Sequence, residues 1–166
     1  MNRKGFTLIE VLAVIVILGI ILVIAAPSLL NAYRDSKLKS EEIFITRLSQ
    51  SIDSYIKLNS SDISFSSNGT ATKTEEGTSY SVNIYKGKKT INDIITDNLI
   101  SLEDYINPGN KDVSCSTNAD IEVYRDSDYV YCHKVKKDSL GCLTDEYINS
   151  ITGDYVIDTC IWEVTS

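Results

Sequence analysis

The sequence predicts an α+β protein in which one long N-terminal helix packs on a small antiparallel β-sheet. Two observations predict this fold. Residues 6–58 have a helical pattern that is apolar on all sides at first and on one side only later. Residues 79–166 contain short runs that alternate between apolar and polar side chains, which is typical of strands with one buried face.

The first part of the predicted helix is long enough to cross a membrane. Residues 11–26 carry no charged side chain, and residues 6–26 would form about 31 Å of helix. Arg3 and Lys4 precede this segment, so the N-terminus is expected to face the cytoplasm. We therefore expect residues 6–27 to be a transmembrane or filament-core helix.

Glu10 lies at the start of this apolar run. A carboxylate in lipid or in a dry helix bundle is costly unless it has a partner. We therefore expect Glu10 to pair with another group. An alternative interpretation is that Glu10 only complements the dipole at the N-terminus of its helix.

The helix is predicted to continue beyond Pro27, because the helical pattern resumes after it. Pro27 removes one backbone donor, so Gly19 and Pro27 are predicted positions of a helix bend. Residues 28–58 are expected to be an amphipathic half that packs on the globular domain, with Glu41 off its apolar side. The predicted apolar stripe consists of Leu30, Tyr33, Leu38, Ile45, Leu48, Ile52, Tyr55 and Ile56.

Beyond the helix, the chain is predicted to form an exposed loop and then a sheet. Residues 59–78 are rich in Ser, Thr, Asn and Gly and are expected to be a connecting loop, with a short strand at Ile63–Phe65. Residues 79–166 are expected to form the globular domain. Its predicted elements are a strand over Ser79–Lys86, a short helix or turn over Thr90–Leu102, a hairpin of Ile121–Arg125 and Tyr129–Val135, and a last strand over Tyr155–Val164.

All four cysteines lie in the last third of the chain, at positions 115, 132, 142 and 160. An even number of cysteines outside the cell favours disulfides between Cys115, Cys132, Cys142 and Cys160, and the spacing leaves all three pairings open. Two alternatives remain at this stage. The thiolates could bind zinc together with His133, or they could be free and buried.

The composition argues against nucleic-acid binding and against catalysis. The chain has 16 basic and 23 acidic residues and a formal net charge of −7, so no specific nucleic-acid site is predicted. The basic runs 86–89 and 134–137 are interpreted as solvated strand ends or turns. His133, the only histidine, is interpreted as a packing residue, so no enzyme and no cofactor are predicted. A calcium loop built from Asp120, Glu122, Asp126 and Asp128 is an alternative to a charged hairpin turn.

The run Lys4–Val11 (KGFTLIEV) and the apolar segment that ends at Pro27 carry a family resemblance. Together they resemble the N-terminus of type IV pilins and pseudopilins. The resemblance implies the pilin fold and a leader, residues 1–5, that a prepilin peptidase removes between Gly5 and Phe6. It also implies methylation of the new amine of Phe6, which becomes a natural partner for Glu10 of a neighbouring copy.

The resemblance implies a structural filament subunit. The subunit would wait in the inner membrane until an assembly platform and motor move it into an extracellular pilus for adhesion, motility or DNA uptake. A pseudopilin of a type II secretion or competence system is an alternative. A membrane-anchored extracellular binding domain that never polymerises is another, and an ordinary secretory signal or single-pass anchor would explain the apolar segment alone.

Overall fold

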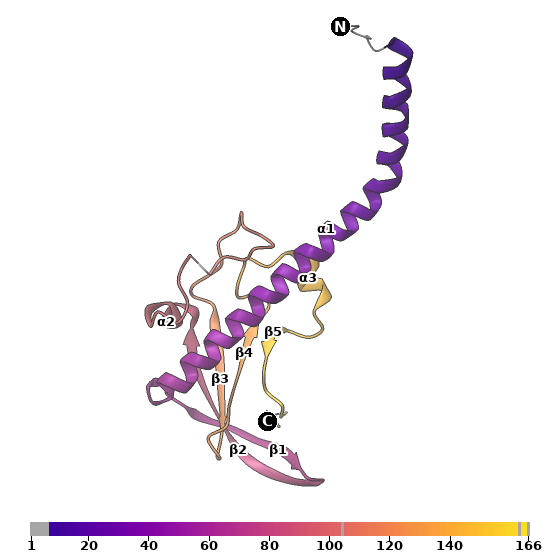
Figure 1. The fold of residues 1–166 in the computed structure, drawn as a ribbon. Coiled ribbons are helices and arrows are strands. Elements are labelled where there is room, and N and C mark those ends of the chain that lie inside the picture. Colours follow the sequence, from indigo (N-terminus) through magenta and orange to yellow (C-terminus); the bar gives the residue numbers. More distant parts are fainter. Residues whose placement is uncertain (1–6, 104, 163, 166) are drawn as a thin grey trace. The chain divides into compact units, whose positions relative to one another are not determined.

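The computed structural model describes residues 7–103, 105–162 and 164–165, and Figure 1 shows the course of the chain. Its first element is a single helix, α1, which runs from Leu8 to Asn59. Pro27 lies inside α1, so the prediction that the helix continues past it is confirmed. The chain divides into two compact units, Met1–Lys37 and Leu38–Ser166, and α1 has residues in both.

In the first unit, α1 exposes every side of its surface. The large apolar side chains from Leu8 to Tyr33 are between 51% and 88% exposed. This is the one helix in the described chain that is long and apolar enough to cross a membrane, judged by length and composition. Leu30 and Tyr33 of the predicted stripe are exposed and not buried, because both lie in the first unit and no described residue covers them. A bend at Gly19 or Pro27 stays a prediction.

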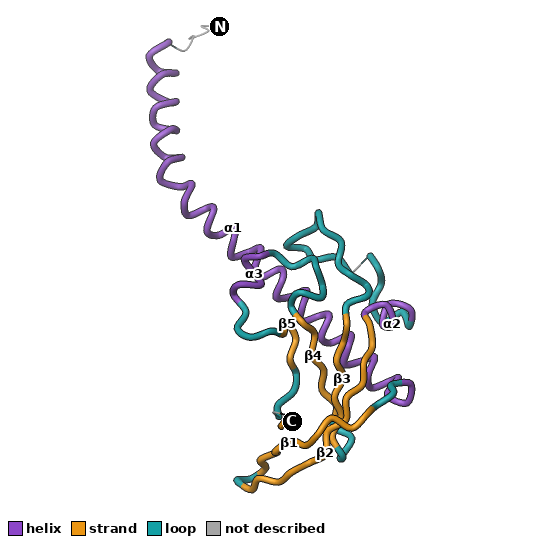
Figure 2. Tube along the Cα trace, turned by 180° about the vertical axis from the view of Figure 1, so that it is seen from behind, coloured by secondary structure: helices purple, strands orange, loops and turns teal. Residues whose placement is uncertain are grey.

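In the second unit, α1 buries one side against the sheet. The buried side chains recur every three or four residues, which is the spacing of one helix face. They are Glu41, Phe44, Ile45, Leu48, Ile52, Tyr55 and Ile56. The predicted α+β arrangement is therefore confirmed, with one helix lying along one side of an antiparallel sheet, as Figure 2 shows from behind.

The sheet has six strands in the order β5-β4-β3-β2-β1-β6, and every neighbouring pair is antiparallel. The strands are β1 Ser66–Glu75, β2 Thr78–Thr90, β3 Asp120–Asp126, β4 Tyr131–Lys136, β5 Tyr155–Asp158 and β6 Val164–Thr165. Three short helical elements complete the described fold: η1 Ser60–Asp62, α2 Ile91–Thr96 and α3 Asp145–Ser150.

Two of the predicted segments differ from the structure. The predicted loop over residues 59–78 contains β1, which pairs with β2 from Ser66↔Lys86 to Glu75↔Thr78. Its Ser and Thr residues are typical of loops, but cross-strand pairing decides their conformation here. The predicted last strand over 155–164 is two strands, β5 and β6, at opposite edges of the sheet.

The two faces of the sheet bury separate apolar clusters. The larger cluster lies between α1 and the sheet and includes Leu48, Ile52 and Val123. The smaller one lies on the opposite face and consists of Ala71, Val82, Ile84, Tyr124, Cys132 and Trp162. Side chains alternate between the two faces along each strand, which explains why Val123 and Tyr124 belong to different clusters.

Candidate functional site

The described part of α1 begins with a hydrogen-bonded turn between Thr7 and Glu10. Oε2 of Glu10 accepts the backbone N–H of Thr7 at 3.0 Å and its hydroxyl at 2.9 Å. The backbone N–H of Glu10 donates to Oγ1 of Thr7 at 3.4 Å. This reciprocal pattern is a capping box, which satisfies donors that a helix N-terminus leaves free.

The sequence carried a signal for this turn that our sequence analysis missed. A Thr followed three residues later by a Glu, directly before an apolar run, is the usual signature of a capping box. Glu10 therefore has a local partner in the single chain, as the helix-terminus interpretation expects. Gly5 and Phe6 lie outside the described residues, so the cleavage site and the Phe6–Glu10 pair remain proposals.

The four cysteines form two disulfides, as predicted. Cys115 bonds to Cys142 and Cys132 to Cys160, and the structure describes no free cysteine. This is one of the three pairings that the spacing left open, and it leaves no thiolate for a zinc site. One disulfide belongs to the cluster under α1, while Cys132 and Cys160 lie at the cluster on the opposite face.

Glu41 is the most completely enclosed acidic group on α1. Its Oε1 accepts Nδ2 of Asn107 at 2.6 Å and the backbone N–H of Thr144 at 3.0 Å, and its Oε2 accepts the Thr144 hydroxyl at 2.6 Å. Asn107 in turn donates to the carbonyl oxygen of Cys142 at 2.8 Å. Glu41 was expected to lie off the apolar side of the helix. It is instead buried, because two distant loops bring donors to its carboxylate.

His133 also joins α1 to the sheet. Its Nε2 lies 3.1 Å from Oγ of Ser49, and its Nδ1 lies 3.2 Å from Oδ1 of Asp53 and 3.3 Å from Oγ1 of Thr159. Burial lowers the pKa of His133, and it outweighs the opposing attraction of Asp53 and Asp158.

The contacts of His133 with Ser49 and Asp53 bring together the three residue types of a hydrolase triad. The surroundings of His133, however, do not suit that chemistry. The His133 side chain has no exposed surface, so no substrate reaches its ring. We interpret the three residues as a polar link between α1 and β4, in line with the predicted packing role of His133.

Most carboxylates of the acidic hairpin bind lysines. Glu122 pairs with Lys86 at 2.9 Å, and Asp120 pairs with Lys88 at 2.7 Å. Asp126, which is fully buried, pairs with Lys73. Three of the four residues considered for a calcium loop are thus engaged by ammonium groups. Within the described residues, no group of three or more His, Cys, Asp or Glu side chains is placed to hold a metal ion.

The two basic runs, 86–89 and 134–137, also form contacts within the sheet, because three of their lysines make ion pairs. Lys86 and Lys88 on β2 bind carboxylates of β3, and Lys134 on β4 binds Asp158 at 2.8 Å. Lys86 retains its proton more firmly than a free lysine, because Glu122 and Tyr124 raise its pKa against the effect of burial. These lysines therefore face carboxylates of their own sheet.

Comparison with known proteins identifies the N-terminal segment. Residues 1–26 match the family model described as the prokaryotic N-terminal methylation motif. No significant match was found among curated proteins or among solved structures. The match covers 26 of the 166 residues, and the matched motif is the class III leader that type IV pilins and pseudopilins carry at the N-terminus.

Proposed function

We propose that the chain is a structural subunit of a type IV pilus that polymerises through the first half of α1. One observation carries this proposal. The described helix from Leu8 to Tyr33 exposes apolar side chains on all sides, and no described residue of the chain covers them. Burying one Leu, Ile or Val side chain gains about 1.5–3 kcal/mol, so this surface must be covered by lipid or by other copies.

The same helix explains two successive locations. Before assembly, residues 6–27 would hold the subunit in the inner membrane as a single-pass protein with a cytoplasmic N-terminus. After a prepilin peptidase removes residues 1–5 and Phe6 is methylated, the assembly platform and motor would move the subunit into an extracellular filament. The two disulfides support an oxidising location for the globular unit.

Glu10 would act in assembly by pairing with the Phe6 amine of a neighbouring copy. In the single chain, Thr7 occupies Oε2 of Glu10. An arriving amine therefore binds the other oxygen or replaces the Thr7 contacts. Because a dry helix bundle disfavours an unpaired carboxylate, this pair would select one axial register between subunits.

Substitutions at Glu10 and Thr7 separate the charge pair from the capping box. Glu10→Gln and Glu10→Ala should leave leader cleavage and membrane insertion intact but abolish or shorten filaments. Thr7→Val removes the hydroxyl of the box and keeps the charge, so it should still assemble. Sheared filaments are counted by electron microscopy. Normal filaments from Glu10→Ala would remove Glu10 from the assembly mechanism.

Leader processing is tested separately. Gly5→Ala should block cleavage, and the intact mass should then include residues 1–5. Native material should lack these residues and carry a methyl group on Phe6. An unprocessed native chain that stays monomeric in the membrane would favour the anchored binding domain. Abundant subunits in sheared filaments would favour a pilus over a pseudopilus.

A further inference from the structure

Four of the seven basic side chains in the strands of the sheet are paired with carboxylates, whereas Lys89, Arg125 and Lys136 form no ion pair among the described residues. Four lysines of the sheet bind acidic partners: Lys73, Lys86, Lys88 and Lys134. Arg125, at the end of β3, makes no ion pair with any carboxylate that the structure describes. Of the three residues without an ion pair, Arg125 alone has a buried side-chain nitrogen without a hydrogen-bond partner in the described structure.

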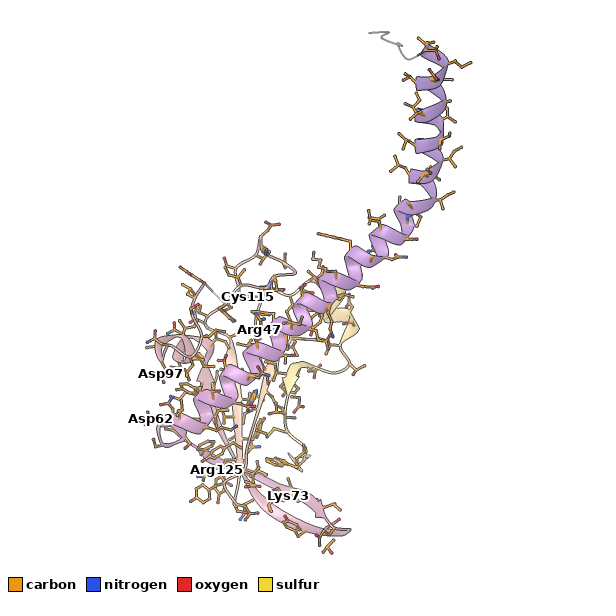
Figure 3. The ribbon with its side chains drawn as sticks, viewed as in Figure 1. Arg47, Asp62, Lys73, Asp97, Cys115 and Arg125 are labelled. Atoms are coloured by element: carbon orange, nitrogen blue, oxygen red, sulfur yellow. A yellow bond between two sulfur atoms is a disulfide. The ribbon has the colours of Figure 1, made fainter. Side chains whose placement is uncertain are left out.

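Aromatic rings surround Arg125 instead. Its Cζ atom lies 4.7 Å from the ring centroid of Tyr129, 4.9 Å from that of Tyr85 and 5.0 Å from that of Phe65. These four residues are called the arginine cage below, and Figure 3 labels Arg125 at its place in the sheet. The rings interact with the guanidinium as cation–π partners.

The local backbone conformation positions two of the residues that carry these rings. Gly87 leaves room for the segment before β1, because a Cβ there would lie 2.5 Å from Ile63 and 3.2 Å from Phe65. Tyr129 has a positive φ of 62°, which is rare for a residue with a bulky side chain. The Asp126 carboxylate fixes this turn by accepting the backbone N–H of Val130 at 2.8 Å.

One donor of the guanidinium has no acceptor. Nε of Arg125 is buried and has no hydrogen-bond partner in the described structure. Buried donors nearly always have partners, so this one points to a missing acceptor. Tyr129 is 67% exposed, whereas Phe65 and Tyr85 are partly buried, so the Tyr129 side chain is the member of the cage most free to turn away and open that edge.

We propose that the arginine cage binds a carboxylate carried on a six-membered ring, from either a sugar acid or an aromatic acid. A carboxylate matches the in-plane N–H groups of a guanidinium in a bidentate pair, while the exposed face of Tyr129 contacts the ring that carries it. The net charge of −7 does not prevent this, because charges beyond about 8–10 Å are largely screened at physiological salt. The neighbouring Asp126 is already neutralised by Lys73.

This binding site does not depend on the proposed filament. The test uses the full chain in detergent micelles and follows the Nε–H resonance of Arg125 and the ring resonances of Tyr129 by NMR. Glucuronate and benzoate are titrated at constant ionic strength, with glucose and benzyl alcohol as their uncharged counterparts. We expect saturable shifts at Arg125 and Tyr129 with at least one of the two acids and none with the uncharged counterparts.

Three variants make the test specific. Arg125→Met should weaken binding about tenfold or more, Arg125→Lys should restore only part of it, and Arg47→Met on α1 should leave it unchanged. Tyr129→Ala should weaken binding while the chain keeps its melting temperature within a few degrees. For Arg125→Met, where the fold itself is at risk, Arg125→Lys keeps the charge and serves as the second variant.

The two acids also identify the source of the carboxylate. Binding of glucuronate alone assigns the site to an acidic saccharide, and binding of benzoate alone assigns it to an aromatic acid. Equal shifts with acids and uncharged counterparts, or acid binding that persists unchanged in Arg125→Met, would overturn the proposal. So would the absence of any saturable shift.

Discussion

Glu10 and Glu41 lie on the same helix, and each is set among apolar side chains, but only Glu41 is buried by its own chain. Glu41 receives three donors from residues that lie 66 and 103 positions away in the sequence. Among the described residues, Glu10 receives donors only from Thr7, within its own turn. The globular unit thus supplies its own partners for Glu41, whereas the first half of α1 presents an apolar surface that no described residue covers.

The largest expected effect on stability comes from Glu41. Glu41→Ala leaves buried donors of Asn107 and Thr144 without acceptors, which should lower the free energy of unfolding of the globular unit by about 3 kcal/mol. Glu10→Ala in the same thermal melt should leave that unit unchanged. Equal losses from the two variants would contradict the contrast between the two glutamates.

The disulfides should matter only in the globular unit. Replacing Cys115 and Cys142 together by Ser, or Cys132 and Cys160 together, should lower its free energy of unfolding by about 2–4 kcal/mol in each case. The sequence separations, 27 and 28 residues, are nearly equal, so the two losses should be similar. The helical signal of residues 8–33 in micelles should not change, and its loss would show that the two units depend on each other.

The pH dependence provides a smaller effect. The pKa of His133 is lower in the folded chain than its ordinary value of 6.5. As the pH falls, the imidazole is therefore protonated in the unfolded chain before it is protonated in the folded chain. Stability should fall as the pH drops below about 6.5, by at most about 1.4 kcal/mol per pH unit. His133→Gln should remove this part of the dependence. A melting temperature that is flat between pH 7 and pH 5 in the unmodified chain would contradict it.

The smallest effect is expected at the surface pair beside Glu41. Lys39 and Glu42 are 2.8 Å apart, and both side chains are more than half exposed. Lys39→Met should change the free energy of unfolding by about 0.5 kcal/mol or less. If Lys39→Met lowered the free energy of unfolding as much as Glu41→Ala, charges on the surface of this part of α1 would stabilise the unit as much as the buried contacts of Glu41 do.

The features that could be predicted from the sequence are those that depend on neighbouring residues. The apolar run after Glu10, the continuation of the helix past Pro27 and the hairpin of β3 and β4 all follow from short-range spacing. The capping box of Thr7 belongs to the same class and was missed although its signal is local.

The features that could not be predicted depend on contacts between distant segments. β1 forms because β2 pairs with it, although its own residues are typical of a loop. The burial of Glu41 needs Asn107 and Thr144, and the arginine cage needs Tyr85 from β2 and Phe65 from the segment before β1. The disulfide pairing likewise follows from the arrangement of the loops and strands.

The central claim is that subunits bury the first half of α1 against one another, and it can be tested with a cysteine placed in that half. The reactivity of this cysteine is measured in sheared filaments that contain no lipid or detergent. The native cysteines are bonded in pairs, so a new thiol at Val16→Cys can be followed alone. We expect this thiol to be protected from a water-soluble thiol reagent, while a thiol at Lys88→Cys on the sheet reacts. Equal labelling at both positions would contradict the claim that neighbouring subunits bury the apolar half of α1.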